Sequence, residues 1–202
     1  MTTVNRTATP VDFRRRLLGG MAEAIAEIGY RDTTVADVVR LAKTSRRTFY
    51  EHFASKETCL TALITDANDE MIRHISAAVD PSAPWPDQVR HAVEAWLACA
   101  DSQPAVFHSW IRDIPSLGAL SRDLQRDLME NFIVMVQTLT DNEGLRALGI
   151  GRVSRPMAIV LLGGLRELIA ATVEDGVAVT AITETAVQAA MALLGPSTPS
   201  GR

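Results

Sequence analysis

The sequence predicts an all-α protein of about nine helices. Hydrophobic residues recur with a helical period along nearly all of its 202 residues, and no segment sustains the alternation of apolar and polar residues that is typical of a strand. Glycine and proline residues separate the periodic segments. With 47% hydrophobic and 22% charged residues, the chain can bury a sizeable core in one or two domains.

The first helix is expected to begin at Pro10 and to end at Gly29. Thr9 offers a hydroxyl cap, proline suits the first helical position, and Asp12 places a carboxylate in the first turn. Apolar residues recur along one face of this helix, namely Phe13, Leu17, Met21, Ile25 and Ile28. This face is predicted to be buried.

Two short helices follow. Thr34 and Asp37 have the spacing of a capping box and predict the start of the second helix. Residues 43–44, Lys-Thr, form the predicted turn, and a third helix runs from Ser45 to about His52. These spacings describe a helix-turn-helix that is supported by the first helix.

A long fourth helix is predicted from its cap at Ser55 to about Val79. Residues 80–87, DPSAPWPD, hold too many prolines for a helix and are predicted to form a linker. The later helices are expected at about residues 87–100, 103–114, 117–139, 155–174 and 181–194.

The charges are divided unevenly along the chain. Residues 1–56 hold 10 Lys+Arg and 6 Asp+Glu, whereas the rest holds 10 basic and 18 acidic residues, so the net charges are +4 and −8. A basic N-terminal segment joined to an acidic body favours a polyanionic partner at one end only.

Other sequence features point to a soluble protein of the cytoplasm. Cys59 and Cys99 lie far apart without a metal-binding spacing, so the sequence predicts neither a disulfide framework nor a zinc site. The N-terminus lacks the apolar segment of a signal peptide. The longest apolar stretch, residues 157–165, is about half of the roughly 20 residues that a membrane span requires.

Residues 33–60, TTVADVVRLAKTSRRTFYEHFASKETCL, carry a specific pattern. A hydroxyl residue starts the second helix, and Ser-x-x-Thr-aromatic-Tyr-x-x-Phe and Ser-Lys-Glu follow in order. In this pattern the chain resembles the TetR family of transcriptional repressors, most strongly over residues 13–63. One departure is Lys43-Thr44, where the family commonly has Gly-Val; a turn with positive φ imposes a steric cost on lysine.

The resemblance implies two domains. Residues 1–54 would form the helix-turn-helix DNA-binding domain, and residues 55–202 a helical domain for effector binding and dimerisation, with helix 55–79 connecting them. It implies a repressor that a small apolar or aromatic effector releases from a palindromic operator. The alternative is a helix-turn-helix regulator without such an effector, controlled by a protein partner or by oxidation of Cys59 or Cys99.

The third helix carries the strongest candidates for DNA contact. Arg46 and Arg47 lie in its first turn, which a recognition helix offers to base edges, and arginine bonds O6 and N7 of guanine bidentately. Thr48 is short enough to approach a thymine methyl group or a phosphate. Phe49 and Phe53 are instead predicted to lie in the core.

Phosphate contacts are expected from neighbouring residues. The resemblance implies them for Tyr50 and His52, although His52 can alternatively cap the helix end. Thr34 and Lys56 lie at helix N-termini, which attract phosphates. The full set assigned to DNA contact is Thr34, Ser45, Arg46, Arg47, Thr48, Tyr50, His52 and Lys56.

The arginines near the N-terminus have two interpretations. Arg6, Arg14, Arg15 and Arg16 form either a basic arm that follows phosphates or enters a minor groove, or a solubilising tail.

In the resembling family the part after the fourth helix encloses an effector pocket, and here the acidic part after residue 79 holds all three tryptophans. Its aromatic and methionine side chains are candidates for binding an apolar or aromatic molecule. They are Trp96, Phe107, Trp110, Met129, Phe132 and Met135. The alternative for each one is ordinary core packing. His108, Arg112 and Asp113 are weaker candidates for polar contacts, with surface or capping roles as the alternative.

The last two long helices are expected to form a homodimer. Gly163 and Gly164 each cost about 1 kcal/mol of helix propensity, which close approach of another helix can offset. The resemblance implies a four-helix interface between two chains. The residues assigned to it are Met157, Leu161, Gly164, Leu165, Leu168, Ala186, Ala190 and Leu193. Burial within a single chain is the alternative.

The sequence offers no enzyme motif. Residues 149–154, GIGRVS, lack the third glycine of a dinucleotide-binding loop, and no strand precedes them. The four histidines lack paired ligand spacing. We therefore expect no catalysis, cofactor, metal or membrane partner, and as partners a double-stranded operator, a small effector and a second copy of the chain.

Overall fold

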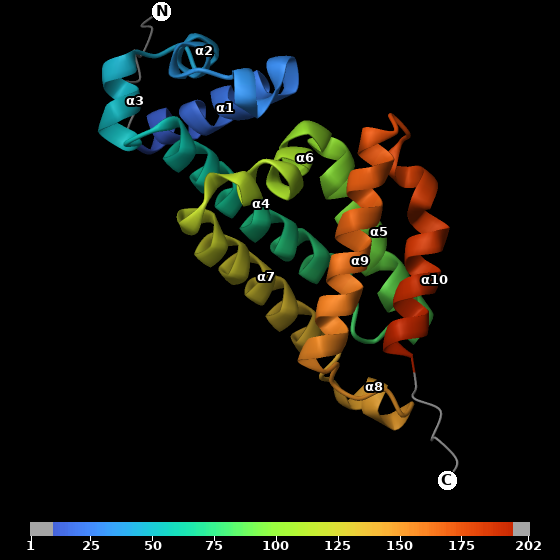
Figure 1. The fold of residues 1–202 in the computed structure, drawn as a ribbon. Coiled ribbons are helices and arrows are strands. Elements are labelled where there is room, and N and C mark those ends of the chain that lie inside the picture. Colours follow the sequence, from blue (N-terminus) through green and yellow to red (C-terminus); the bar gives the residue numbers. More distant parts are fainter. Residues whose placement is uncertain (1–9, 196–202) are drawn as a thin grey trace, which may run out of the picture.

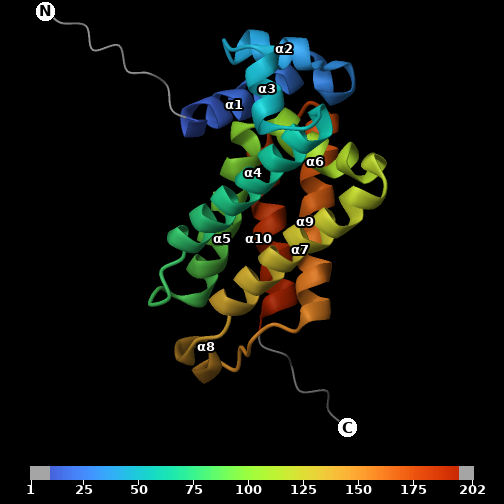
Figure 2. The same cartoon turned by 90° about the vertical axis from the view of Figure 1, so that its left-hand side faces the viewer.

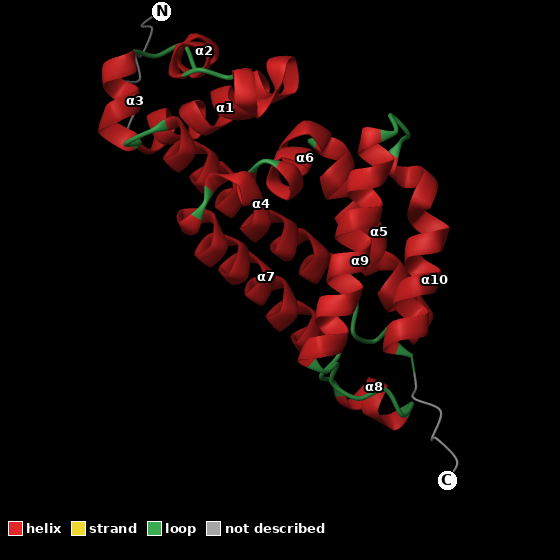
Figure 3. Ribbon diagram, viewed as in Figure 1, coloured by secondary structure: helices red, strands yellow, loops and turns green. Residues whose placement is uncertain are grey.

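The computed structural model describes residues 10–195, and this range contains helices and no strands (Figure 3). The α-helices are α1 (Pro10–Asp32), α2 (Val35–Leu41), α3 (Arg46–His52), α4 (Lys56–Ala78), α5 (Trp85–Ser102), α6 (Pro104–Arg112), α7 (Ala119–Leu139), α8 (Glu143–Ala147), α9 (Arg155–Glu174) and α10 (Thr183–Leu194). Two 3-10 turns, Ile114–Leu117 and Val179–Ile182, precede α7 and α10. The predicted all-α fold is confirmed.

The helices form an elongated molecule with the three N-terminal helices at one end (Figure 1). Helix α4 starts beside them and runs into the body, where it packs against α5 and α7. Helices α9 and α10 pack together on one side of the body. Helix α8 lies at the end opposite to α1–α3 (Figure 2).

Helix α1 bends near its C-terminus because Gly29 adopts φ 75°, ψ 158°. The helix therefore ends its regular part where the sequence predicted. The prediction that this face is buried is wrong for Ile28, which lies next to the bend and is 45% exposed. The buried hydrophobic residues of α1 are Leu17, Leu18, Met21, Ala24, Ile25 and Tyr30.

The turn between α2 and α3 has the left-handed geometry that the sequence raised as a question. Lys43 has φ 51°, and the N–H groups of Thr44 and Lys43 donate to Val39 O (3.0 Å) and Arg40 O (3.2 Å). This is the hydrogen-bond pattern of a Schellman motif, whose left-handed position is usually glycine. Lys43 therefore carries the expected steric cost.

Close packing of α1 on α2 sets the angle of the helix-turn-helix. A Cβ added to Gly20 would lie 2.6 Å from Val38 O and 2.9 Å from Ala42 N. Any larger residue would separate the two helices. Arg16 adds a second connection, because its Nε donates to Ala42 O (3.0 Å) and its Nη2 to Lys43 O.

The body differs from the prediction at the start of α5 and in the presence of α8. Helix α5 starts at Trp85, inside the predicted linker, because Pro86 occupies one of the first positions of a helix, where proline is tolerated. The short helix α8 was not predicted; Asn142 caps it by accepting the N–H of Leu145 (2.9 Å). Five residues are too few to show a helical period.

Candidate nucleic-acid interface and internal cavities

Helix α3 is fixed by a buried face and a capped start. Phe49 is fully buried and Phe53 is 6% exposed, which confirms that both belong to the core. Ser45 caps the helix by accepting the N–H of Thr48 (3.0 Å). Arg46 and Arg47 lie in the first turn of this seven-residue helix, and both are exposed.

The two arginines differ in their partners. Arg47 Nε donates to Glu51 Oε1 (3.1 Å) one turn further along, and 90% of its side chain is exposed. Arg46 forms no ion pair with any residue in the range 10–195. Such an exposed guanidinium retains all of its donors for an external acceptor such as a base edge.

The other predicted contacts on α3 are partly accessible. Tyr50 is 59% exposed, and its ring packs edge-on against Phe49. His52 and Thr48 are half-buried, and the Thr48 hydroxyl lies 2.9 Å from that of Ser45. Of these three residues, Tyr50 is therefore the most accessible.

Thr34 forms the predicted capping box at the start of α2. Its hydroxyl accepts the N–H of Asp37 (3.3 Å) and donates to Asp37 Oδ2 (2.6 Å), and its backbone N–H donates to the same carboxylate (3.0 Å). These hydrogen bonds lower the pKa of Asp37 below its ordinary value. Thr34 itself is exposed.

Lys56, which was predicted to contact a phosphate, is instead bonded within the chain. Its Nζ donates to the carbonyl oxygens of Tyr30 (3.0 Å), Arg31 (3.4 Å) and Thr33 (2.8 Å). The same Nζ lies 4.3 Å from the centre of the Tyr30 ring. An ammonium group has three donors, so these carbonyls use all of them. Lys56 therefore joins the start of α4 to the end of α1.

We expect Lys56→Ala to lower the free energy of unfolding by about 1 to 3 kcal/mol, because hydrogen bonds from a charged donor are lost and three carbonyls lose their partner. Chemical denaturation measures this change. Lys43→Ala is the matched control, since it removes an exposed lysine of the same domain. A Lys56→Ala protein of unchanged stability that binds all DNA sequences more weakly would instead support the phosphate contact.

Three arginines of the expected N-terminal arm belong to α1 and are engaged within the chain. Arg14 forms a two-bonded ion pair with Asp66 on α4 (2.8 and 3.1 Å), and Arg15 pairs with Asp12 (3.0 Å). Arg16 bonds the turn after α2, as described above. The interpretation of these residues as a free arm or tail is therefore wrong, and Arg6 lies outside the described residues.

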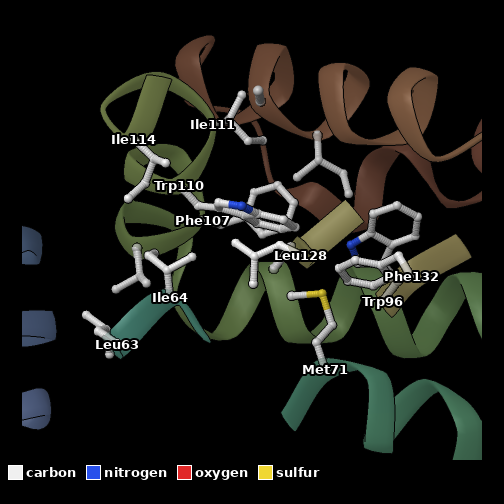
Figure 4. Packing of buried hydrophobic residues seen from close by; sticks show 14 of the residues in the cluster. Leu63, Ile64, Met71, Trp96, Phe107, Trp110, Ile111, Ile114, Leu128 and Phe132 are labelled. Atoms are coloured by element: carbon white, nitrogen blue, oxygen red, sulfur yellow. The ribbon is translucent and has the colours of Figure 1, made fainter. Parts of the chain in front are cut away.

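The predicted effector residues lie mainly in one aromatic cluster in the body (Figure 4). The ring of Phe132 is stacked between two indoles, with its centre 5.5 Å from that of Trp96 and 5.9 Å from that of Trp110. Phe107 packs edge-on against Trp110 at 5.3 Å. The four aromatic residues that the sequence assigned to effector contact therefore pack against one another.

Two cavities adjoin this cluster. The first, here the Trp96 cavity, has a volume of about 70 Å³ and is lined by Trp96 and Met135 with apolar residues of α4, α5, α7, α9 and α10. The second, here the Asn68 cavity, has a volume of about 350 Å³ and is lined by Phe107 and Trp110 with residues of α4 and α5. Met129 and Phe132 line neither cavity, and their assignment as effector contacts stays a prediction.

The polar candidates near α6 form surface ion pairs. Arg112 bonds both Glu167 and Glu174 of α9 (2.8 and 2.6 Å), and His108 Nε2 lies 3.3 Å from Glu174. Asp113 lies 3.5 Å from Arg31 Nε at the end of α1. These residues therefore connect α6 to α9 and to the N-terminal helices.

Helices α9 and α10 present an exposed apolar surface, but not through all of the predicted residues. Leu161, Leu165, Ala186 and Ala190 are at most 6% exposed, which agrees with the alternative of burial within a single chain, and their assignment to a dimer contact stays a prediction. Met157 and Gly164 are exposed, and Leu168 and Leu193 are half-buried. Exposed apolar residues that were not assigned to the dimer contact are Ile159 (44%) and Val160 (57%).

We define the α9 face as Met157, Ile159, Val160 and Gly164. Within the described residues, α9 alone has the length and the apolar composition that a membrane-spanning helix needs. One such helix is weak evidence for a membrane span. Its two apolar sides account for this composition, since one packs into the core and the other is the α9 face.

The comparisons with known proteins agree with this geometry. Residues 17–63, from α1 into α4, match the family described as bacterial regulatory proteins, tetR family. The uncharacterized HTH-type transcriptional regulator YhgD of Bacillus subtilis (strain 168) is 29% identical over 87 residues, which are 43% of this chain and 46% of YhgD. The match thus spans about half the length of that relative.

Two solved structures share the fold of the whole chain. The fatty acid degradation regulator FadR of Bacillus halodurans has a TM-score of 0.78 at 16% identity, covering 94% of this chain and 97% of FadR. FadR of Bacillus subtilis, in complex with stearoyl-CoA, has a TM-score of 0.75 at 14% identity, covering 91% and 99%. The match over residues 17–63 places α1 to the start of α4 in the TetR family of bacterial regulatory proteins, and the two solved structures share the fold of the whole chain.

Proposed function

We propose that this protein is a homodimeric repressor that leaves a palindromic operator when a small apolar or aromatic molecule enters its helical body. The observation that carries the proposal is the surface of α3, where Arg46 and Arg47 are exposed while Phe49 of the same helix is fully buried. A rigidly held helix with exposed arginines in its first turn suits direct contact with guanine in a major groove.

Dimerisation follows from the size of one recognition helix and from the α9 face. One α3 contacts too few base pairs for useful affinity, whereas two related by a twofold axis meet successive major grooves. The α9 face leaves Val160 57% and Ile159 44% exposed. Burial of this surface against a second copy would remove it from water and fix the spacing of the two α3 helices.

Effector release is supported by the cavities and by α4. The Trp96 cavity and the Asn68 cavity both border α4, and the N-terminus of the same helix is bonded through Lys56 to the end of α1. A molecule that displaces α4 would change the separation of the two α3 helices. The complex of Bacillus subtilis FadR with stearoyl-CoA gives further support for an effector within this fold.

The alternative of control by cysteine oxidation has no support in the environment of the thiols. Cys59 is fully buried, and burial raises its pKa to about 12. Cys99 is half-buried, and burial raises its pKa as well, with Glu70 as a smaller cause. Oxidation proceeds through the thiolate, which such pKa values suppress near neutral pH.

Selection of random duplexes with the purified chain tests the proposal. We expect enrichment of an inverted repeat whose half-sites are about one helical turn apart. A library of small molecules is then screened for release of the selected duplex, measured by fluorescence anisotropy at fixed salt. Because coupling is reciprocal, the duplex should weaken binding of a releasing molecule by the same factor, typically about 1 to 3 kcal/mol.

Two results would contradict the proposal. Duplexes without a common sequence after selection would rule out an operator. A cavity-bound molecule with equal dissociation constants in the presence and absence of saturating operator would rule out its role in release.

A further inference from the structure

The Asn68 cavity is lined by apolar and aromatic side chains together with several polar ones. It lies between α4, α5 and α6, with Met71 on α4 and the rings of Phe107 and Trp110 on α6 among its lining residues. Asn68 also lines it and is only 2% exposed. The sequence signal for this residue is its position on α4, four residues after Ile64 and three before Met71, both of which are buried.

The amide of Asn68 has no hydrogen-bond partner. Neither Nδ2 nor Oδ1 bonds another group, and neither is open to solvent. Buried polar groups are nearly always paired, because an unpaired donor or acceptor in an apolar interior loses its hydration without compensation. The unpaired state therefore costs stability, and a molecule that supplies both a donor and an acceptor would recover it.

We infer that the Asn68 cavity binds a small, neutral, flat aromatic molecule that carries a hydrogen-bond donor and an acceptor on adjacent atoms, as in a lactam or a carboxamide. Asn68 Oδ1 accepts from the donor of the ligand, and Asn68 Nδ2 donates to its acceptor. The rings of Phe107 and Trp110 provide the aromatic wall. This inference names the effector class for the proposed function and therefore rests on it.

The charges around the cavity favour a neutral ligand. No lysine or arginine lines it, whereas Glu70 does, with an oxygen 3.3 Å from His74 Nδ1. Glu70 is itself paired with Arg73, which does not line the cavity, so a carboxylate or phosphate ligand would meet no unpaired permanent cation there. A carboxylate would also leave Asn68 Oδ1 without a donor.

Binding at Asn68 requires a displacement of its surroundings, because both amide atoms are covered in this conformation. The elements that enclose the cavity are α4, α5 and α6, and α6 also packs against α1 and α9. A ligand that pairs with the amide therefore favours a conformation in which these helices have moved. Such a difference in affinity between two conformations is what an effector needs to change DNA binding.

The test uses three probes of similar shape: 2-quinolone has adjacent N–H and C=O groups, 1-methyl-2-quinolone lacks the donor, and 2-naphthoate is an anion. Calorimetry and quenching of tryptophan fluorescence measure binding to the full-length protein. We expect 2-quinolone to bind at least about tenfold more tightly than either of the others, since each leaves part of the Asn68 amide unpaired.

Two substitutions distinguish recognition by Asn68 from general apolar binding. Asn68→Leu should weaken 2-quinolone by about tenfold or more and raise the Tm of the ligand-free protein by about 2 to 4 °C, because an unpaired amide is removed. Gln88→Leu is the matched control. The Gln88 amide is buried but donates to Pro81 O (3.2 Å) and Ala83 O (2.8 Å), so its loss should lower the Tm and leave 2-quinolone binding unchanged.

The inference is overturned if 2-quinolone does not bind, if it binds no better than 1-methyl-2-quinolone, or if Asn68→Leu binds it as the wild type does. The probe series needs no variant, so a substitution that prevents folding leaves the test intact. If 2-quinolone binds through Asn68 but does not affect operator affinity, the site stands and effector release fails. If a molecule of another class releases the operator and 2-quinolone does not bind, effector release stands and the inference about the Asn68 cavity fails.

Discussion

Replacing Arg46 by alanine is expected to weaken operator binding by about 1 to 3 kcal/mol for each half-site and to relax the base preference there. The proposed dimer places two α3 helices on the operator, so the effect is counted twice. Arg46 is exposed and forms no ion pair within residues 10–195, so its guanidinium reaches a base without breaking an internal contact.

Arg47→Ala should have a smaller effect than Arg46→Ala. Arg47 must exchange its Glu51 partner at 3.1 Å for DNA, and an exposed pair of this kind contributes about 0.2 to 1 kcal/mol. Fluorescence anisotropy at fixed salt gives both affinities, and a repeated selection gives the preferences. Arg126→Ala is the control, because Arg126 is exposed and paired with Asp123 on α7. Unchanged preferences in both variants would show that neither arginine contacts a base.

Val160→Glu is expected to convert the dimer into monomers and thereby to abolish operator binding. The substitution puts a carboxylate at the centre of the α9 face, and an unpaired charge buried in an interface costs at least about 3 kcal/mol. Each dimer would contain two such carboxylates, one from each chain, so the cost is counted twice. The dimer dissociation constant should therefore rise by a factor of at least about 10,000, as measured by sedimentation velocity.

Val134→Glu on α7 is the matched control, because Val134 is 52% exposed and Val160 is 57% exposed. The same charge is introduced at a similarly exposed valine outside the α9 face. A Val160→Glu protein that remains dimeric would place the interface elsewhere. Monomers that still bind the full operator tightly would show that DNA binding does not require the α9 face.

The local structure of the N-terminal helices was predictable from short-range patterns. Thr34 and Ser55 cap α2 and α4 as their spacing indicated, and α9 has the predicted bounds, Arg155–Glu174. These features depend on hydrogen bonds between residues three or four positions apart and on a long apolar period. The boundary at residue 54 stays an interpretation, since the family match continues to residue 63 within α4.

The sequence by itself determined the all-α class, the helix-turn-helix and the family, because each depends on residue types at fixed local spacings. Only the tertiary structure decided which side of each amphipathic helix is covered. Leu161 and Val160 are adjacent and both apolar, but Leu161 is 5% and Val160 57% exposed. Likewise, the carbonyls that bind Lys56 come from residues 23 to 26 positions away. Contacts at such separations arise from the packing of whole helices, which a local period does not specify.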